Sequence, residues 1–380
     1  MSTLVESVGD PRAPRVPGPR KCQRGGRWVA KLALLLIFSV LSVLLLEGVV
    51  RLLMPQPPSW LAVYRRHPVL DLFTLAENVT YVVESGEANW SVFTDESGYR
   101  ISPDHQRNAE LPISLWIGDS FTFGHGVDHA KSWIGLLNED PDRRVEFVNA
   151  AVSAYGPVQY RQTLDYLISQ GVKPRELLIG NFLGNDYFDI ALSRDFPVVD
   201  GIIQERSNLK TVIKKYSHTY RLLSNMYHSF FAKSRPAGPK EIEAQLYRQE
   251  SWTVGNLRQP LAMYRMELQK IQAICKEHSI NLFVMLIPTR YSVRNTRAHA
   301  VNRLDDADRT HELPRDHAVA VLTELGIGHL DLTPFLIGHA TNDVYYRFNG
   351  HFTPLGHQLV YAALKRHRDD ADVMETSDQE

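Results

Sequence analysis

The chain has 380 residues, of which 44% are hydrophobic and 22% are charged, and its formal net charge is −1. This length and composition are typical of one large domain with a full hydrophobic core and some accessory segments. The near-neutral charge gives no electrostatic basis for binding nucleic acid, so we expect no nucleic-acid partner. The cysteines, Cys22 and Cys275, match neither a disulfide framework nor a zinc site, and we expect both to be inert.

An apolar segment lies near the N-terminus. Residues 32–46 read LALLLIFSVLSVLLL and the run continues to Met54, which supplies the roughly 20 residues that a membrane-spanning helix needs. Glu47 and Arg51 stand four residues apart near its end, where they are expected to pair. We predict an uncleaved membrane anchor over residues 29–54. A cleaved signal peptide is the alternative, but no small-residue cleavage site follows the run.

Basic residues are concentrated before this segment or at its start. They are Arg12, Arg15, Arg20, Lys21, Arg24, Arg27 and Lys31. The positive-inside rule therefore predicts a single-pass membrane protein with a cytoplasmic N-terminus and an extracytoplasmic remainder, either periplasmic or extracellular. Residues 1–28 are rich in Pro, Gly and Arg, which predicts a disordered basic tail.

The rest of the chain divides by its sequence pattern. Residues 55–112 start with the stiff PQPPSW spacer and continue as short apolar pieces between turn residues, which predicts a small β-rich lead-in. Residues 113–366 alternate strand-like and helical segments. Within them, residues 187–256 are too long for an ordinary crossover and predict an inserted helical cap. Residues 367–380 predict a frayed acidic tail.

The alternation of strands and helices predicts an α/β fold with a central parallel sheet of about five strands, covered on both faces. The predicted strands are residues 113–118, 145–152, 176–184, 281–288 and 329–333. Helical segments are predicted from residue 132 onward and over residues 158–171.

Candidate polar groups, from side chains or the backbone, follow four of these strands at the carboxyl edge, where open parallel sheets place their sites. Ser120 lies in WIGDSFTFGHGV, at a sharp turn into a helix whose N–H groups suit an oxyanion. Ala154 or Gly156, in VSAYGP, can present a backbone N–H to the same point. Asn185, in LGNDYF, can donate its amide, and His351 lies in FNGHFTPLGH.

Each of these residues by itself also has an ordinary structural explanation. Ser120 can cap a helix, GND is a common turn, and an isolated histidine is usually structural. The convergence of four separate segments on one sheet edge is what indicates a nucleophilic site.

Three motifs carry a family resemblance. GDSFTFGHGV, LGNDYF and NGHFTPLGH, in this order and over this strand pattern, resemble the SGNH (GDSL-type) hydrolase family, particularly its membrane-anchored extracytoplasmic bacterial members. The resemblance covers about residues 113–190 and 280–366. It implies a flavodoxin-like three-layer α/β/α fold and acyl transfer from esters to water or to sugar hydroxyls.

The resemblance also implies roles for individual residues. Ser120 corresponds to the nucleophile, His351 to the general base and Asn185 to an oxyanion donor. The family's glycine donor falls at Ala154, with Gly156 close by. This chemistry needs no metal and no cofactor.

The departure from the family is Asn349, which stands where the triad aspartate is expected. An asparagine can accept a hydrogen bond from the histidine but carries no charge to stabilise imidazolium. Its NH₂ group can also favour the wrong tautomer, and the comparable change in a serine protease lowers kcat by ~10⁴. Two compensations are open: Asp343, six residues upstream, or a backbone carbonyl that orients His351. We expect His125, in the Gly-rich turn, to face solvent.

Three functions remain open at this point. The first is a serine esterase or acylhydrolase that acts on an O-acyl ester outside the cytoplasm. The second is an O-acetyltransferase that modifies cell-envelope polysaccharide with the same residues, and the third is a catalytically weak glycan-binding or assembly protein. The expected partners are an acyl ester or acylated glycan, the membrane through the N-terminal helix, and components of cell-envelope assembly.

Overall fold

The computed structural model describes residues 24–55, 63–84, 87–191, 198–199, 202–203, 213, 217–231, 258–293, 313–339, 341–347 and 349–377. The predicted basic tail up to residue 23 and most of the predicted cap at 187–256 lie outside the described residues. Two compact units are present. One comprises Met1–Gln56 with Ser217–Thr219, and the other comprises Pro57–Tyr216 with Tyr220–Glu380.

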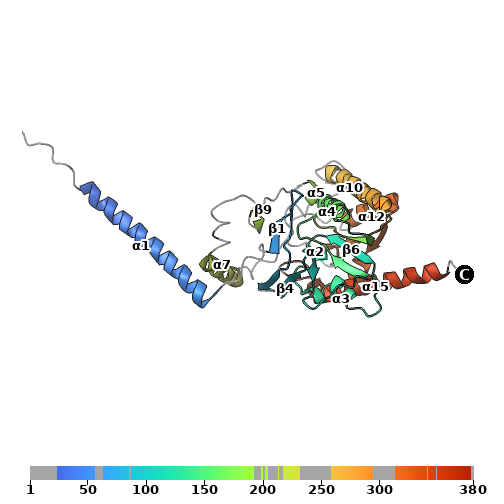
Figure 1. The fold of residues 1–380 in the computed structure, drawn as a ribbon, viewed down its shortest axis with the longest axis horizontal. Coiled ribbons are helices and arrows are strands. Elements are labelled where there is room, and N and C mark those ends of the chain that lie inside the picture. Colours follow the sequence, from blue (N-terminus) through green and yellow to red (C-terminus); the bar gives the residue numbers. More distant parts are fainter. Residues whose placement is uncertain are drawn as a thin grey trace, which may run out of the picture. The chain divides into compact units, whose positions relative to one another are not determined.

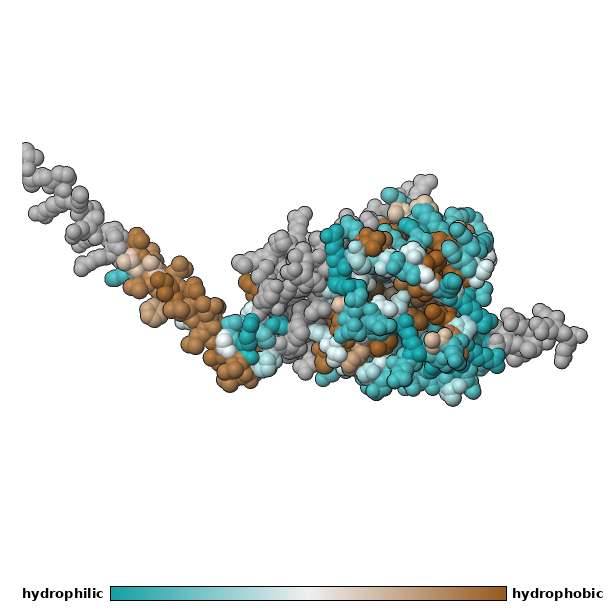
Figure 2. All heavy atoms as spheres, in the orientation of Figure 1, coloured by the Kyte–Doolittle hydropathy of each residue, from teal (hydrophilic) through white to brown (hydrophobic). Residues whose placement is uncertain are grey.

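The first unit is dominated by helix α1 (Arg24–Leu53). Its segment Trp28–Leu53 has 26 residues and is the one stretch, within the described part of the chain, that is long and apolar enough to cross a membrane. Figure 2 shows the almost uniformly hydrophobic surface of this helix. A signal sequence near an N-terminus has the same properties, so the helix is a candidate span or signal.

Glu47 is the one acidic residue of α1, and its carboxylate is well paired. It accepts a hydrogen bond from Arg51 at 3.4 Å, which is the pair expected from the sequence. It also accepts hydrogen bonds from Ser217 Oγ at 2.8 Å and from the backbone N–H groups of His218 and Thr219 at 2.7 and 3.0 Å. The carboxylate thus binds N–H groups of the first turn of helix α7 (His218–Phe231), a favourable place for a negative charge.

The second unit is built on an eight-stranded sheet with the order β12-β11-β8-β6-β7-β5-β4-β3. Its parallel strands are β6 (Ile113–Gly118), β7 (Glu146–Asn149), β8 (Pro174–Phe182), β11 (Asn281–Ile287) and β12 (Gly328–Asp331). All five predicted strands are therefore confirmed. Numbered along the chain, they lie in the order 2-1-3-4-5, which is the flavodoxin-like arrangement, with its switch point between β6 and β8.

The predicted lead-in extends this sheet. Its antiparallel strands β3 (Thr80–Glu84), β4 (Asn89–Thr94) and β5 (Arg100–Ile101) continue the sheet beyond β7, where Arg100 pairs with Asn149. These strands cover the edge that β7 would otherwise expose. Strands β1 (Tyr64–Arg66) and β2 (Phe73–Leu75) form a separate antiparallel pair.

Helices cover both faces of the sheet (Figure 1). On one face lie α4 (Pro157–Ser169), α10 (Arg258–Glu277) and α12 (Leu313–Leu325), and on the other lie α3 (Trp133–Asn138), α13 (Thr333–Leu336) and α15 (Pro354–Ser377). Leu115 and Ile117 of β6 pack into the core under α4, α10 and α12. Trp116 points to the other face and packs into the core under α3, α13 and α15. This alternation gives the three-layer α/β/α fold.

The remaining described elements are short. They are α2 (Ser120–Phe123), the 3₁₀ helix η2 (His129–Lys131), α5 (Asp186–Ala191), β9 (Val198–Val199), β10 (Ile202–Ile203), α11 (Arg290–Val293) and α14 (Thr341–Val344). Helix α15 continues to Ser377, so the described part of the predicted frayed tail is helical. Cys275 on α10 is buried, and burial raises the pKa of its thiol to about 12, which makes it unreactive.

Two glycines allow α2 to pack on the sheet at the switch point. Gly118 of β6 pairs with Gly180 of β8. A Cβ atom on Gly118 would lie 2.2 Å from Thr122 Oγ1 of α2, and one on Gly180 would lie 1.9 Å from the same atom. Because neither residue has a Cβ, Thr122 sits directly over both strands and holds the start of α2 against the sheet edge.

We predict that Gly180→Ala destabilises the protein by about 1–3 kcal/mol, because the added methyl group overlaps Thr122. Adding Thr122→Ala removes the hydroxyl and should restore most of the lost stability. The measurement is urea unfolding of the detergent-solubilised full chain, followed by tryptophan fluorescence. Gly328→Ala is the control, since its Cβ would meet only Phe283 Cδ2 at 3.3 Å and Cε2 at 3.7 Å. Equal losses for the two glycines would contradict the explanation.

Candidate active site

Ser120 lies at the turn from β6 into α2. Asp119 caps the helix, with its Oδ1 accepting a hydrogen bond from the backbone N–H of Phe121 at 2.9 Å. Helix α2 is only four residues long and is capped by Gly124, whose φ of +84° is readily adopted only by glycine. The half-buried Ser120 is therefore held in a sharp turn at the carboxyl edge of the sheet, in the first turn of a helix.

His351 meets Ser120 across this edge. Its Nε2 lies 2.8 Å from Ser120 Oγ, and its Nδ1 lies 2.9 Å from Asn349 Oδ1. The turn that carries it is fixed on both sides: the N–H of Tyr346 donates to the carbonyl of His351 at 2.8 Å, and Gly350, at φ +78°, donates to the carbonyl of Tyr346 at 3.1 Å. The structure thus brings Ser120, His351 and Asn349 into one hydrogen-bonded chain.

The backbone settles which atom of Asn349 faces the imidazole. The N–H of His351 donates to the same Asn349 Oδ1, at 2.9 Å. An amide NH₂ group cannot accept a hydrogen bond, so the atom that receives both contacts is oxygen. Nδ1 of His351 then carries the proton and donates it to Asn349. Nε2 is left as the acceptor for the Ser120 hydroxyl, which is the tautomer that a general base requires.

The other acid considered from the sequence lies elsewhere. Asp343 is exposed on α14, and its backbone carbonyl accepts a hydrogen bond from Thr353 Oγ1. Nδ1 of His351 faces Oδ1 of Asn349 and not the carboxylate of Asp343.

The three oxyanion candidates differ in what they already bind. The N–H of Gly156 donates to Gln159 Oε1 at 3.1 Å as part of the cap of α4, so it is engaged. Ala154 is exposed and has φ +67°, the left-handed conformation that suits a glycine at this position. Asn185 follows β8, and its Oδ1 is buried without a hydrogen-bond partner among the described residues. Since the Gly156 N–H is engaged, Ala154 and Asn185 stay the predicted donors.

The imidazole of His351 is held neutral by its surroundings. Burial lowers its pKa to about 4, and a backbone hydrogen bond of Asn349 opposes that shift. The ring of His125 lies against it, with the ring centroids 4.5 Å apart, and the ring of Trp90 lies 5.0 Å from that of His125. The prediction that His125 faces solvent is wrong. Burial, followed by the charges of His351 and Arg100, places the pKa of His125 well below its usual value.

Arg100 supports the turn that carries His125. Its guanidinium is buried and donates to the carbonyls of Phe123, Gly124 and Val127, with the Gly124 contact at 2.7 Å. The side chain also lies over the rings of Trp90 and Phe123, 5.1 and 4.5 Å from their centroids. Burial lowers the pKa of Arg100 to about 9, so it remains a cation at neutral pH. No motif in the sequence marks this residue.

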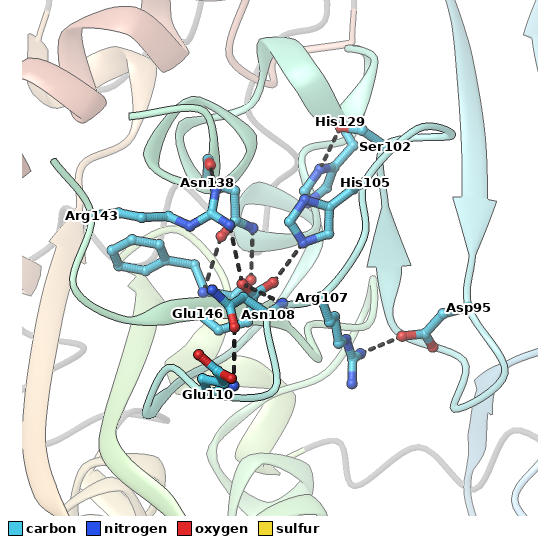
Figure 3. Close-up of polar contacts among 11 residues, drawn as sticks. Asp95, Ser102, His105, Arg107, Asn108, Glu110, His129, Asn138, Arg143 and Glu146 are labelled. Atoms are coloured by element: carbon cyan, nitrogen blue, oxygen red, sulfur yellow. Dashed lines mark hydrogen bonds and ion pairs between the residues drawn. The ribbon is translucent and has the colours of Figure 1, made fainter. Parts of the chain in front are cut away.

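A second polar cluster lies at the opposite ends of the strands (Figure 3). Glu146, the first residue of β7, contacts His105 Nε2 at 2.5 Å and Arg143 at 3.5 Å, and accepts a hydrogen bond from the N–H of Asn108 at 3.4 Å. This cluster ties the loop before β6 to the amino end of the sheet, away from Ser120. Among the residues that the structure describes, no three His, Cys, Asp or Glu side chains are grouped closely enough to hold a metal ion.

A flavodoxin-like sheet with a Ser-His-Asn chain at its switch point has the framework of a serine-dependent ester hydrolase or acyltransferase. Residues 246–380 match the family model described as the SGNH hydrolase-like domain of the acetyltransferase AlgX. The match covers about a third of the chain and includes Asn349 and His351 but not Ser120. Over these residues, the resemblance to SGNH hydrolases is confirmed. No curated protein sequence matches the chain.

Solved structures with a similar fold are also found. A GDSL-like lipase from Bacteroides thetaiotaomicron is 11% identical over 70% of this chain and 92% of its own, with a TM-score of 0.37. A lipase/acylhydrolase from Enterococcus faecalis is 14% identical over 68% and 95%, with a TM-score of 0.38. The acetylxylan esterase Axe2 from Geobacillus stearothermophilus is 14% identical over 67% and 93%, with a TM-score of 0.37. Likenesses this distant carry no argument about the activity of this chain.

We predict that Ala154→Gly raises the free energy of unfolding by about 0.5–1 kcal/mol, because it removes the Cβ from a residue in the left-handed region. Ser279→Gly is the matched control: Ser279 follows α10 with φ +56°, away from Ser120, and should give a similar gain. Thermal or urea unfolding of the full chain measures both. A loss of stability in Ala154→Gly alone would show that its Cβ makes a compensating contact.

Proposed function

We propose that the chain is a serine esterase of the SGNH type that acts on an O-acyl ester outside the cytoplasm. One observation carries the proposal: Ser120 Oγ, both ring nitrogens of His351 and Asn349 Oδ1 form a continuous chain with contacts of 2.8 and 2.9 Å. A neutral histidine of the correct tautomer, in contact with a serine hydroxyl in a helix N-terminal turn, is the arrangement that activates a serine nucleophile.

In the first step, Ser120 Oγ attacks the carbonyl carbon of the ester while His351 Nε2 takes the hydroxyl proton. Asn349 Oδ1 holds the Nδ1–H of the imidazolium that forms. The carbonyl oxygen becomes an oxyanion, for which the N–H groups of Ser120 and Ala154 and the amide of Asn185 are the proposed donors.

In the second step, His351 gives its proton to the leaving alcohol and an acyl-Ser120 ester remains. The neutral His351 then removes a proton from an incoming water molecule, whose oxygen attacks the acyl carbon. Collapse of the second tetrahedral intermediate breaks the bond to Ser120 Oγ. The proton returns to Oγ and the carboxylic acid leaves.

The extracytoplasmic location is supported by α1 and by the charges around it. The apolar segment Trp28–Leu53 is long enough to span a bilayer. Basic residues before it are more numerous than those after it, which favours a cytoplasmic N-terminus. An exported domain would then meet acylated components of the cell envelope.

A second candidate function is an O-acetyltransferase acting on cell-envelope polysaccharide. It is favoured by the match of residues 246–380 to the domain of an acetyltransferase. The same acyl-Ser120 intermediate would then be attacked by a sugar hydroxyl in place of water. Release of acetate with no acetylated sugar, in the presence of an oligosaccharide acceptor, supports the esterase; acetylated sugar supports the transferase.

We predict that a fluorophosphonate probe labels the detergent-solubilised full chain at Ser120, because the serine is activated by His351. Ser120→Ala should abolish labelling and lower the kcat for an aryl acetate by at least ~10³. The control is Ser97→Ala in an exposed turn, which should change neither. Labelling that persists in Ser120→Ala would exclude Ser120 as the nucleophile. Absence of labelling in the wild type, together with labelling in Asn349→Asp, would favour the glycan-binding alternative.

We also predict a specific pH dependence. Because the pKa of His351 is about 4, its base form is complete well below neutral pH, so kcat/KM should be flat above about pH 6 and should fall as pH decreases through about 4. In Asn349→Asp a carboxylate faces Nδ1 and favours the imidazolium, so the acidic limb should move up by about 1–3 pH units.

In the same experiment, kcat of Asn349→Asp should rise about tenfold, because a negative charge now faces the imidazolium. Asn349→Ala is the control. It removes the hydrogen bond to Nδ1 without adding a charge, so activity should fall and the limb should not move up. A limb that stays in place in Asn349→Asp would contradict the assignment of His351 as the base.

A further inference from the structure

A carboxylate from the predicted lead-in reaches the turn that carries His351. Glu87, in the connection between β3 and β4, accepts a hydrogen bond through Oε2 from the backbone N–H of Asn349 at 2.9 Å. The two residues are 262 positions apart in the chain. Glu87 and Asn349 are both half-buried, so the contact is partly shielded from water.

Asn349 is therefore held at two points. Its N–H donates to Glu87 Oε2, and its Oδ1 accepts hydrogen bonds from the N–H and the Nδ1 of His351, both at 2.9 Å. Together with the contact between His351 and Ser120, a continuous path leads from a carboxylate, through one asparagine, to the imidazole and the serine. A carboxylate thus lies one residue further from the histidine than a triad aspartate would.

We propose that Glu87 is a positioning residue that both fixes Asn349 against His351 and supplies the negative charge that the Asn349–His351 pair lacks. The inference rests on the proposed function, because it concerns the same Ser120–His351 pair. It assigns to the β3–β4 connection, which lies outside the parallel sheet, a part of the catalytic apparatus.

The charge matters when His351 takes the proton of Ser120. The imidazolium formed in the transition state has a neutral amide as its direct partner, so its stabilisation depends on the nearest charges that are not fully screened by water. We expect a carboxylate one residue away in a half-buried site to stabilise that cation by an amount that corresponds to about tenfold in rate. The neutral ground state of His351 gains much less, so the effect falls on kcat and not on KM.

Other charged groups also border this turn. Arg290 donates to the carbonyls of Tyr346 and Arg347 at 3.2 and 2.8 Å, and the charge of Asp128 raises the pKa of Tyr346, but Glu87 is the carboxylate bonded to Asn349 itself. His125 and His357 each couple to His351, and burial keeps the pKa of both low, so both are neutral rings at neutral pH. Tyr346 precedes the turn and donates its hydroxyl to the carbonyl of Gly126 at 3.0 Å. Burial raises the pKa of Tyr346, and the charges of Glu87 and Asp128 raise it further, so it too is neutral. The effect on Tyr346 is consistent with a Glu87 charge directed toward this turn.

A purely structural role for Glu87 makes a different prediction. If the carboxylate only pins the turn, removing its charge while keeping a hydrogen-bond acceptor should leave catalysis intact. Glu87→Gln does this, because Gln retains a side-chain oxygen for the N–H of Asn349. Placing an aspartate at 349 supplies the charge directly, and Glu87 should then become dispensable.

The experiment is a double-mutant cycle on the detergent-solubilised full chain with an aryl acetate. Glu87→Gln in the wild-type background should lower kcat about tenfold and leave KM within about twofold. Glu87→Gln combined with Asn349→Asp should lower kcat less than about twofold relative to Asn349→Asp alone. Glu96→Gln, in an exposed turn, is the control and should have no effect in either background. Equal losses in both backgrounds, or no loss in the wild type, would overturn the charge role.

A readout that does not need turnover separates this inference from the proposed function. In the full chain labelled with ¹⁵N-histidine, NMR titration should show a lower pKa for His351 in Glu87→Gln than in the wild type, and an unchanged value would overturn the inference. If no variant takes up fluorophosphonate at Ser120, the proposed function fails, and the titration still decides whether the Glu87 charge acts on His351.

Discussion

The hydrogen bond from the backbone N–H of His351 to Asn349 Oδ1 is the constraint on which the site depends. It needs no additional side chain as donor, because the donor is a backbone N–H of the same turn. By requiring an oxygen at that position, it turns the NH₂ group of Asn349 away from the imidazole, so that Nδ1 donates and Nε2 accepts. A serine protease with the corresponding asparagine loses activity largely because the histidine adopts the wrong tautomer. For the base role proposed for His351, the backbone removes that problem and leaves only the missing charge.

The surroundings of the pair are organised by neutral rings and backbone dipoles. His125 and His357 are both kept neutral mainly by burial. The buried cation of Arg100 adds to this, because its charge lowers the pKa of both rings. Its own charge is spread over carbonyls at the end of α2 and in the following turn, which suit a positive charge. Arg100 thereby fixes the turn after α2, which places His125 against His351. Thr122 fixes the start of α2 on the sheet.

The parallel sheet could be predicted from the sequence because buried parallel strands are continuous apolar runs. Such a run is clearest in β6, β8 and β11. The sequence also placed Ser120, His351 and Asn349 at one edge, since each follows a strand end. Glu87 and Arg100 could not be found in this way. Their importance depends on the pairing of β5 with β7 and on a contact across 262 residues, and neither leaves a periodic pattern. His125 was misplaced because a glycine-rich turn suggests exposure, whereas Arg100 and Trp90 hold this turn partly buried.

An asparagine next to the histidine leaves the pKa of the histidine low, whereas an aspartate would raise it. An adjacent carboxylate raises the pKa of a histidine, so the base form is lost under mildly acidic conditions. With Asn349 in that place, burial dominates and the pKa of His351 falls to about 4, so the neutral imidazole that the proposed mechanism uses persists at pH values where a charged triad is already protonated. The cost is weaker stabilisation of the imidazolium in the transition state. In the proposed role of Glu87, a carboxylate held one residue away recovers part of that stabilisation in the transition state while the ground state of His351 stays neutral.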